Sequence, residues 1–286
     1  MNTLEITKKI MRQNGIIAKK SFGQNFLIND NVLESIVEAG NITEQDVVIE
    51  IGPGLGNLTE YLLNTGAKVI CFEIDEKMQE ILENRFKNKE NLQIIMQDIL
   101  KVDLKEYLPE DKKVKIIANL PYYITTPIIF KLLEYFENID RIVIMIQKEV
   151  AERLIAKEKS KDYGVLTINV GYKTDVEKVI DVPNSSFIPE PNVISSVVKI
   201  TPNKEKMEAL GIQDEKTFHK VIKLGFATRR KKLLNSLSLT NEIGISKEEI
   251  KEIMDELNIN ENARAEELNI KDIVNLANKI YNKQKK

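Results

Sequence analysis

The sequence contains few of the side chains that most often carry out covalent or metal chemistry. Cys71 is the one cysteine of the chain, and His219 is the one histidine. A single cysteine excludes an internal disulfide and a cysteine-based metal cluster. Because Cys71 lies within the strand-like run VICFEI, we predict that it fills space in the core. We therefore predict no metal site.

Long apolar runs are also absent from the sequence. The chain nowhere has about 18 consecutive apolar residues, the length that suggests a membrane-spanning helix. Its opening, MNTLEITKKIMRQNG, lacks the apolar centre of a signal peptide. We expect a soluble, cytoplasmic, globular protein with no membrane partner. At 286 residues, 42% of them hydrophobic, it is long enough for one large domain and a small second one.

Neither sign of charge dominates the chain, whose formal net charge is −2, but the charges are segregated. Residues 219–235 carry six Lys or Arg and no acid, whereas residues 242–267 carry nine acids against three bases. The overall balance argues against a uniformly basic nucleic-acid binder. The local basic cluster, taken alone, fits either a docking site for a polyanion or an ordinary solvated helix face.

Between residues 46 and 147, short apolar runs alternate with amphipathic stretches. This alternation is typical of βαβ units and of a parallel sheet covered by helices on both faces. The predicted strands are 46–51, 68–74, 92–97, 114–119 and 141–147, and the predicted helices are 57–64, 76–86, 126–136 and 148–156. Asn57 and Asp75 are the predicted N-caps of the first two of these helices.

Three later stretches are rich in β-branched residues and predict further strands, two of them forming a hairpin. They are VLTINVGY (165–172), DVEKVIDV (175–182) and VISSVVKI (193–200). From near residue 201 the sequence becomes polar and then helical in pattern. We therefore predict an α/β domain with an N-terminal arm at residues 1–203, and a small all-helical domain at residues 204–286.

The segment EIGPGLGN (50–57) follows the first predicted strand and precedes a helix, where open α/β sheets bind nucleotides. Gly52, Gly54 and Gly56 allow a sharp turn and a close approach of the backbone to a ligand. A dinucleotide-binding fingerprint would have a glycine where this chain has Asn57, so the spacing favours another ligand over NAD. A tight turn without a ligand is the alternative.

Acidic residues follow at the ends of the next two predicted strands. Glu73 is placed to accept hydrogen bonds from both hydroxyls of a ribose, and Asp98 from the amino group of an adenine. Sites for NAD and for S-adenosylmethionine share the ribose-binding carboxylate, and either acid alone could be a helix cap or a solvated loop residue. In series with the glycine loop, the two acids predict one crevice for a nucleoside ligand.

The segment NLPY (119–122), at the end of the fourth predicted strand, resembles a known methyltransferase signature. It is similar to the Asp/Asn-Pro-Pro-aromatic motif of S-adenosylmethionine-dependent amino-group methyltransferases, and its leucine form resembles the rRNA adenine N6-dimethyltransferases, most of all their small-subunit members. Three further segments resemble that family in the family's order: KSFGQNFL (20–27), SFIPEPNVISSVV (186–198) and FATRRKKLLNSL (226–237), the last resembling a basic helix.

The resemblance implies a Rossmann-like methyltransferase sheet with a C-terminal antiparallel strand, and S-adenosylmethionine as the cofactor. The implied reaction is N6,N6-dimethylation of two adjacent adenosines in the 3′-terminal hairpin loop of 16S rRNA, within the assembling small subunit (pre-30S), by a monomer. A 23S rRNA methyltransferase of the antibiotic-resistance type and a non-catalytic ribosome-assembly factor are the alternatives. An NAD-dependent oxidoreductase would leave NLPY unexplained.

The chemistry of adenine suggests a role for each residue of NLPY. The lone pair of the exocyclic nitrogen is delocalised into the ring, which makes this nitrogen a poor nucleophile. The side-chain oxygen of Asn119 and the carbonyl of Leu120 can accept its two hydrogens and favour a pyramidal nitrogen, while Pro121 fixes the turn. Tyr122 can stack on the base, and the resemblance places Phe187 on the opposite face.

The resemblance also assigns the residues that bind the cofactor and the RNA. The cofactor residues are Gln24, Asn25 and Leu27 at the methionine end, Gly52 and Gly54 beneath the ligand, Glu73 and Asp98 at the adenosine, and Asn119. The predicted phosphate contacts are Arg229, Arg230, Lys231 and Lys232. We expect His219 to be structural or near the RNA, because it lies far in sequence from the crevice.

Overall fold

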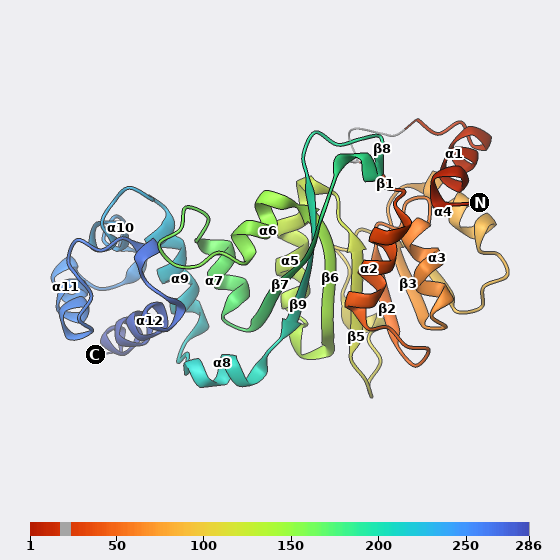
Figure 1. Cartoon of the computed structure of the whole chain (residues 1–286). Helices are drawn as coiled ribbons and strands as arrows, with labels where there is room; N and C mark the ends of the chain where they lie inside the picture. Colours follow the sequence, from red (N-terminus) through yellow and green to blue (C-terminus); the bar gives the residue numbers. More distant parts are fainter. Residues whose placement is uncertain (18–23, 286) are drawn as a thin grey trace. The chain divides into compact units, whose positions relative to one another are not determined.

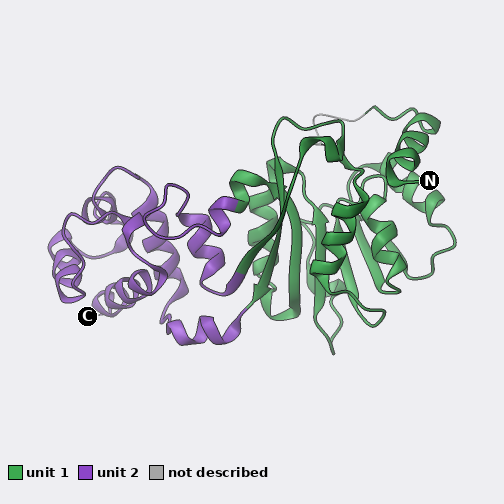
Figure 2. Ribbon diagram, viewed as in Figure 1, with its two compact units in different colours: residues 1–151, 176–202 green, residues 152–175, 203–286 purple. Residues whose placement is uncertain are grey.

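The computed structural model describes residues 1–17 and 24–285 (Figure 1). The predicted motif at 20–27 therefore lies partly outside the described residues. Contacts divide the chain into two units, shown in green and purple in Figure 2. Unit 1 comprises residues 1–151 and 176–202, and unit 2 comprises residues 152–175 and 203–286.

A seven-stranded sheet forms the centre of the α/β fold, in the order β4-β3-β2-β5-β6-β9-β7. The strands are β2 (Val47–Ile51), β3 (Lys68–Glu73), β4 (Leu92–Met96), β5 (Val114–Asn119), β6 (Ile139–Gln147), β7 (Thr174–Val182) and β9 (Ser195–Pro202). The pairs β4–β3, β3–β2, β2–β5 and β5–β6 are parallel, whereas β9 runs antiparallel to β6. The predicted Rossmann-like sheet with a C-terminal antiparallel strand is confirmed.

Several helices of the α/β fold begin directly after a residue whose side chain caps them. They are α1 (Thr3–Gln13), α2 (Asp30–Gly40), α3 (Asn57–Asn64), α4 (Glu76–Arg85), α5 (Thr125–Leu133) and α6 (Lys148–Leu154). Asp75 caps α4 as predicted, because its side chain accepts a hydrogen bond from the Lys77 N–H at 3.0 Å. Cys71 is buried in the core among apolar side chains of α2, α3 and the sheet, as predicted.

The prediction for Asn57 was wrong, since Gly56 is the N-cap of α3 and has a left-handed backbone with φ of 81°. A β-carbon on Gly56 would lie 2.6 Å from the ring of Phe86, so a side chain cannot be accommodated there. Asn57 is the first residue of the helix and is buried, which frees its side chain for contacts with other elements.

A short antiparallel pair joins two segments that are distant in the sequence. Strand β1 (Phe26–Leu27) pairs with β8 (Phe187–Ile188), and Leu27 lies opposite Phe187. Short 3₁₀ helices are η2 (Leu104–Tyr107), η3 (Tyr122–Ile124), η4 (Phe136–Asn138), η5 (Asn184–Ser186), η6 (Asn241–Ile243) and η7 (Ala265–Glu267).

Unit 2 is built mainly from helices around its own apolar core. These are α7 (Val165–Gly171), α8 (Lys204–Leu210), α9 (Glu215–Phe226), α10 (Leu233–Leu237), α11 (Lys247–Glu256) and α12 (Ile270–Gln284). Tyr163, Ile168 and Tyr172 belong to this core, together with side chains of α9 to α12. Residues 152–175 therefore group with the C-terminal helices, whereas the sequence places them in the first domain.

The prediction of a strand at 165–172 was wrong, because this stretch forms α7. The side chain of Thr167 accepts a hydrogen bond from the Gly164 N–H at 3.1 Å, which starts the helix. Thr167, Ile168 and Val170 are buried. Packing of this face outweighs the β-propensity of the individual residues. Within the described residues, the structure contains no helix long and apolar enough to cross a membrane.

Candidate active site

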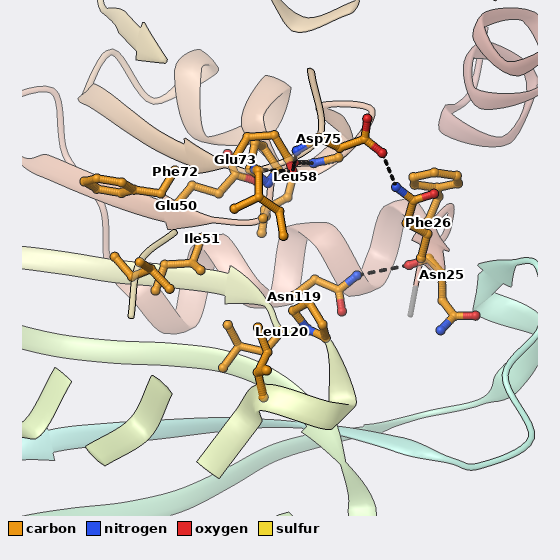
Figure 3. Close-up of a pocket in the computed structure, with 18 of the residues that line it drawn as sticks. Asn25, Phe26, Glu50, Ile51, Leu58, Phe72, Glu73, Asp75, Asn119 and Leu120 are labelled. Atoms are coloured by element: carbon orange, nitrogen blue, oxygen red, sulfur yellow. Dashed lines mark hydrogen bonds between the residues drawn. The ribbon is translucent and has the colours of Figure 1, made fainter. Parts of the chain in front are cut away.

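A pocket lies at the carboxyl ends of β2, β3, β4 and β5 (Figure 3). Parallel strands bring their carboxyl ends to one edge of a sheet, so residues that are distant in the sequence meet there. The predicted site residues that line this pocket are Gln24, Asn25, Leu27, Gly52, Gly54, Glu73, Asp98, Asn119, Leu120, Pro121 and Tyr122. The structure thus places most of the predicted cofactor and catalytic residues around one space.

The glycine loop follows β2 and is held by the carboxylate of Glu73. Gly52 and Gly54 have φ values of 68° and 55°, which few other residues adopt. Glu73 accepts hydrogen bonds from the backbone N–H groups of Gly54 at 3.1 Å, Ile74 at 2.8 Å and Asp75 at 3.0 Å. Burial raises the pKa of Glu73, while these hydrogen bonds lower it. A β-carbon on Gly52 would meet no atom within 4 Å, so the loop leaves open space beside it.

The segment that begins at Gln24 is fastened to two edges of the pocket. The side-chain nitrogen of Asn119 donates a hydrogen bond to the Asn25 carbonyl at 3.2 Å, and that of Gln24 donates to Asp75 at 3.2 Å (Figure 3). Asp75 caps α4, and Asn119 ends β5. These two hydrogen bonds therefore fix the N-terminal segment relative to the ends of β3 and β5.

Asn119 presents an acceptor to the pocket because its amide nitrogen is already engaged with Asn25. Among the described residues, no donor is hydrogen-bonded to the side-chain oxygen of Asn119 or to the Leu120 carbonyl. The backbone after them is fixed, since the Leu120 N–H donates to Met145 and the Pro121 carbonyl accepts from the Ile124 N–H at 3.2 Å. Two hydrogen-bond acceptors are thus available on adjacent residues.

Tyr122 lines the same part of the pocket and is held by its hydroxyl. This hydroxyl and that of Ser195, in β9, are 2.7 Å apart, and partial burial raises the pKa of Tyr122. The phenol therefore stays neutral at physiological pH. Its neighbour Tyr123 also lines the pocket and is 56% exposed, which adds a second aromatic ring that the sequence did not single out.

Asp98 lies in the turn after β4. One carboxylate oxygen accepts a hydrogen bond from the Leu100 N–H at 3.0 Å and shapes this turn. The side chain is partly exposed and lines the pocket. Asp98 thus combines a local turn contact with a position from which it can accept a hydrogen bond from a ligand.

The structure does not bring Phe187 into this pocket. Its ring is 1% exposed and belongs to the same apolar core as Leu27, Val182 and Val197. Phe187 pairs with Leu27 across the β1–β8 ladder, so its side chain adds to packing beneath the N-terminal segment. Stacking on a base would require the ring to leave this core.

Glu50 is a pocket residue that the sequence analysis missed. It lies within β2, is 1% exposed, and accepts hydrogen bonds from the Thr59 hydroxyl at 2.7 Å and the Cys71 thiol at 3.3 Å. Burial is the main cause that raises its pKa to about 7. One acid within the otherwise apolar strand VVIEI was the signal that could have revealed it.

A buried network behind the glycine loop was also missed. One guanidinium nitrogen of Arg85 donates hydrogen bonds to the Leu55 carbonyl at 2.6 Å and to the side-chain oxygen of Asn57 at 3.1 Å, and Arg85 also pairs with Glu60. The side-chain nitrogen of Asn57 donates to the Leu27 carbonyl at 2.8 Å and, at the same distance, to a threonine hydroxyl of α1. Asn57 therefore joins the glycine loop to the N-terminal segment.

The predicted RNA contacts lie in unit 2, in the turn between α9 and α10, although the sequence resemblance suggested a helix. All four residues, Arg229, Arg230, Lys231 and Lys232, are exposed. His219 does not line the pocket. It is partly buried on α9 and contacts Asn169 at 2.6 Å, and burial lowers its pKa. This placement fits a structural role.

Comparisons with known proteins point to one family. The family model described as "Ribosomal RNA adenine dimethylase" matches residues 16–282. The protein named ribosomal RNA small subunit methyltransferase A of Bacillus licheniformis is 43% identical over 281 residues, covering 96% of this chain and 95% of the relative. The protein of the same name from Leuconostoc mesenteroides is 45% identical over 276 residues, covering 94% of this chain and 92% of the relative.

Two solved structures share the fold over most of the chain. A dimethyladenosine transferase from Plasmodium falciparum superposes with a TM-score of 0.76 at 29% identity, covering 91% of this chain and 98% of the other. The 23S rRNA methyltransferase ErmE gives a TM-score of 0.66 at 21% identity, covering 90% of this chain and 100% of the other, and shows likeness of fold alone.

Proposed function

Because the chain belongs to the ribosomal RNA adenine dimethylase family, we infer that it is an S-adenosylmethionine-dependent rRNA (adenine-N6,N6)-dimethyltransferase. Its substrate is ribosomal RNA. We propose that it methylates two adjacent adenosines in the 3′-terminal hairpin loop of 16S rRNA. The names of the relatives, which are small-subunit methyltransferases, support this target over 23S rRNA.

The observation that carries the proposal is the pair of acceptors at the end of β5. The side-chain oxygen of Asn119 and the carbonyl of Leu120 have no donor among the described residues, and both residues line the pocket. An adenine amino group supplies two N–H donors to such a pair. Two accepted hydrogen bonds would hold the nitrogen in place and oppose delocalisation of its lone pair into the ring. This positioning can contribute about 7–11 kcal/mol in well-oriented reactions.

The pocket also fits the cofactor by its own residues. Open space beside Gly52 admits a ligand, and Glu73 and Asp98 provide carboxylates at neighbouring strand ends. Gln24 and Asn25 close the pocket from the N-terminal side. S-adenosylmethionine supplies the activated methyl group when it is bound. The residues of the chain bind and orient the cofactor and the adenine, and the reaction needs no nucleophile from the protein.

The reaction does not require a general base from the protein. Within the described residues, the pocket lining contains no histidine, lysine or cysteine. A methylated exocyclic nitrogen is cationic and strongly acidic, so it loses its proton to water. We propose that Tyr122, whose hydroxyl contacts that of Ser195, stacks on the adenine, a contact worth about 1–3 kcal/mol.

The form in which the RNA is presented is also part of the proposal. A target adenine must leave its stack to reach a pocket, which costs least in a single-stranded loop. We propose that the enzyme acts as a monomer on the assembling pre-30S subunit, which implies a cytoplasmic location. We further propose that the α/β unit performs catalysis and that the helical unit binds rRNA.

The test is methyl transfer from labelled S-adenosylmethionine to three substrates: unmodified small subunits, large subunits and naked rRNA. We expect label in small subunits, at N6 of two adjacent adenosines. Label in large subunits alone would identify the 23S activity instead. Binding to small subunits without transfer, while the cofactor binds, would identify an assembly factor and contradict the proposed catalysis.

A further inference from the structure

We propose that residues 157–161, the lysine loop, bind phosphates of the substrate rRNA next to the turn at Arg230–Lys232, and that Arg229 positions this loop. The inference rests on the proposed function and extends it, because it assigns RNA contacts to a segment that the sequence places in the other domain. All residues concerned lie in unit 2.

Two hydrogen bonds tie the lysine loop to the rest of unit 2, and a third joins the two residues that hold it. The Lys159 N–H donates to the Glu266 carbonyl at 2.8 Å. Arg229 donates from Nε to the Glu266 carboxylate at 2.9 Å and from Nη2 to the Ser160 carbonyl at 3.4 Å. Arg229 and the backbone of Glu266 therefore connect the loop directly to the turn that carries the other basic residues.

The backbone of the loop has a defined shape. Lys159 has φ of 68°, in the left-handed region that few residues other than glycine adopt. Such a conformation persists where the surrounding structure holds it, and here the hydrogen bond to Glu266 does so. The Ser160 N–H also donates to the Lys157 carbonyl at 3.2 Å, which closes a turn. The loop is thus a fixed platform for its side chains.

The charges of this surface are free to meet a polyanion. Lys157, Lys159 and Lys161 are exposed, as are the three basic residues at 230–232. None of these six forms an ion pair within the described part of the chain, whereas Arg229 is paired with Glu266. Glu158 is the one acid within the loop. The excess of unpaired cations matches the regularly spaced charges of an RNA backbone.

Arg229 consequently has a different role from its neighbours. Its guanidinium already binds a carboxylate and a carbonyl oxygen, and its side chain is 53% exposed. The paired carboxylate offsets its charge, so Arg229 offers less to a phosphate than Arg230 does. We assign it as a positioning residue that keeps the lysine loop beside the turn.

The experiment measures binding of the full-length protein to unmodified small subunits over a range of salt concentrations. The variant is Lys157→Gln, Lys159→Gln and Lys161→Gln together. The matched control is Lys216→Gln, Lys247→Gln and Lys271→Gln, which removes three exposed lysines elsewhere in unit 2. Thermal unfolding and S-adenosylmethionine binding verify that each variant is folded.

We expect the loop variant to bind less tightly and its log–log salt slope to shrink by about 0.7–0.9 for each lost contact, so by about 2–3 for three lysines. The control should keep the wild-type slope. An unchanged slope in the loop variant, or an equal loss of slope in the control, would overturn this proposal. The proposed function would still stand if the wild type methylates small subunits. Failure of the wild type to bind small subunits would contradict both the role of the lysine loop and the proposed function.

Arg229→Gln tests the positioning role in a double-mutant comparison. Alone it should weaken binding, because the loop loses its tie to the turn. Combined with the three lysine changes it should add little further loss, since the lysines it positions are gone. A full additional loss in the combined variant would show that Arg229 contacts phosphate itself and would refute the positioning role.

Discussion

The pocket at the strand ends and the basic surface of unit 2 differ in how their polar groups are held. In the pocket, Glu73, Asn119 and Tyr122 each have hydrogen-bond partners in the chain that fix their position. On the basic surface, Arg229 is paired with Glu266, whereas six exposed cations beside it have no ion-pair partner among the described residues: Lys157, Lys159, Lys161, Arg230, Lys231 and Lys232. In the pocket, hydrogen bonds fix the positions of individual polar atoms, whereas the basic surface offers exposed, unpaired charge.

This difference corresponds to two tasks in RNA recognition. Contacts with a base select a target and must be accurate to a fraction of an ångström, whereas contacts with phosphates supply affinity and tolerate variation. Changes in the pocket should therefore affect turnover, cofactor binding or stability and leave the salt dependence of RNA binding unaltered. Changes on the basic surface should alter the salt dependence of RNA binding and leave turnover, cofactor binding and stability unaltered.

Asn119→Ala should give the largest effect. It removes one of the two acceptors for the adenine amino group and the hydrogen bond to Asn25. We expect turnover to fall by about 10²–10³-fold, as when one preorganised hydrogen-bonding group is lost at a reacting centre. The salt slope of small-subunit binding should change little.

Single-turnover methyl transfer measures this effect, with Asn138→Ala at an exposed position as the control. Wild-type turnover in Asn119→Ala would contradict the role of the acceptor pair. A change in salt slope as large as that of the lysine-loop variant would break the distinction between the two regions.

Glu50→Gln should change stability with pH. The pKa of Glu50 in the folded chain, about 7, lies above the ordinary value of 4.5, so the folded state binds the proton more tightly. The contribution of Glu50 to stability is therefore present below about pH 4.5 and is lost as pH rises through 7. The neutral glutamine avoids this loss, and we expect it to be more stable than the wild type by about 3 kcal/mol at pH 8.

Urea unfolding at pH 5 and pH 8 measures the difference between Glu50→Gln and the wild type. Glu34→Gln, at an exposed position in α2, is the control. The advantage of Glu50→Gln should be much smaller at pH 5 than at pH 8. An equal advantage at both values would show that ionisation of Glu50 does not cause it.

Asn57→Ala should have the smallest effect of the three. The change leaves the Leu27 carbonyl without its donor and removes one acceptor of Arg85. Unsatisfied buried groups of this kind cost about 1–3 kcal/mol. Because Asn57 connects the glycine loop to the N-terminal segment, we expect KM for S-adenosylmethionine to rise more than kcat falls.

Steady-state kinetics with varied cofactor, together with thermal unfolding, measure the Asn57→Ala effect. Asn64→Ala, an exposed change at the other end of α3, is the control. A loss of stability without any change in KM would limit Asn57 to a structural role. A change in small-subunit affinity alone would contradict its assignment to the pocket.

The sequence predicted those features that depend on local patterns. Mainly apolar runs of six or seven residues located β2 to β6, and the parallel order then brought Glu73, Asp98 and Asn119 to one edge. Glycine spacing located the loop. These predictions succeeded because burial on both faces of a parallel sheet leaves a strong apolar signal in the sequence.

Features that depend on distant contacts could not be predicted in the same way. Residues 165–172 have β-propensity, but packing in the core of unit 2 makes most of them helical. Asn57 has a side chain that can cap a helix, but this side chain is hydrogen-bonded to Leu27 and Arg85 instead. Arg229 is one of four adjacent basic residues, and its contacts with the distant residues Glu266 and Ser160 distinguish it.

The composition of unit 2 has a consequence for how the chain is made. Its core combines residues 152–175 with residues 203–286, and residues 176–202 between them complete the sheet. During synthesis, residues such as Tyr163 and Tyr172 emerge from the ribosome before α9 and α12, with which they share a core. Their apolar side chains lack these packing partners until the rest of the unit has been translated. A fragment that starts at residue 204 would lack these aromatic side chains, so no single cut in the chain separates the whole of unit 2 from the α/β unit.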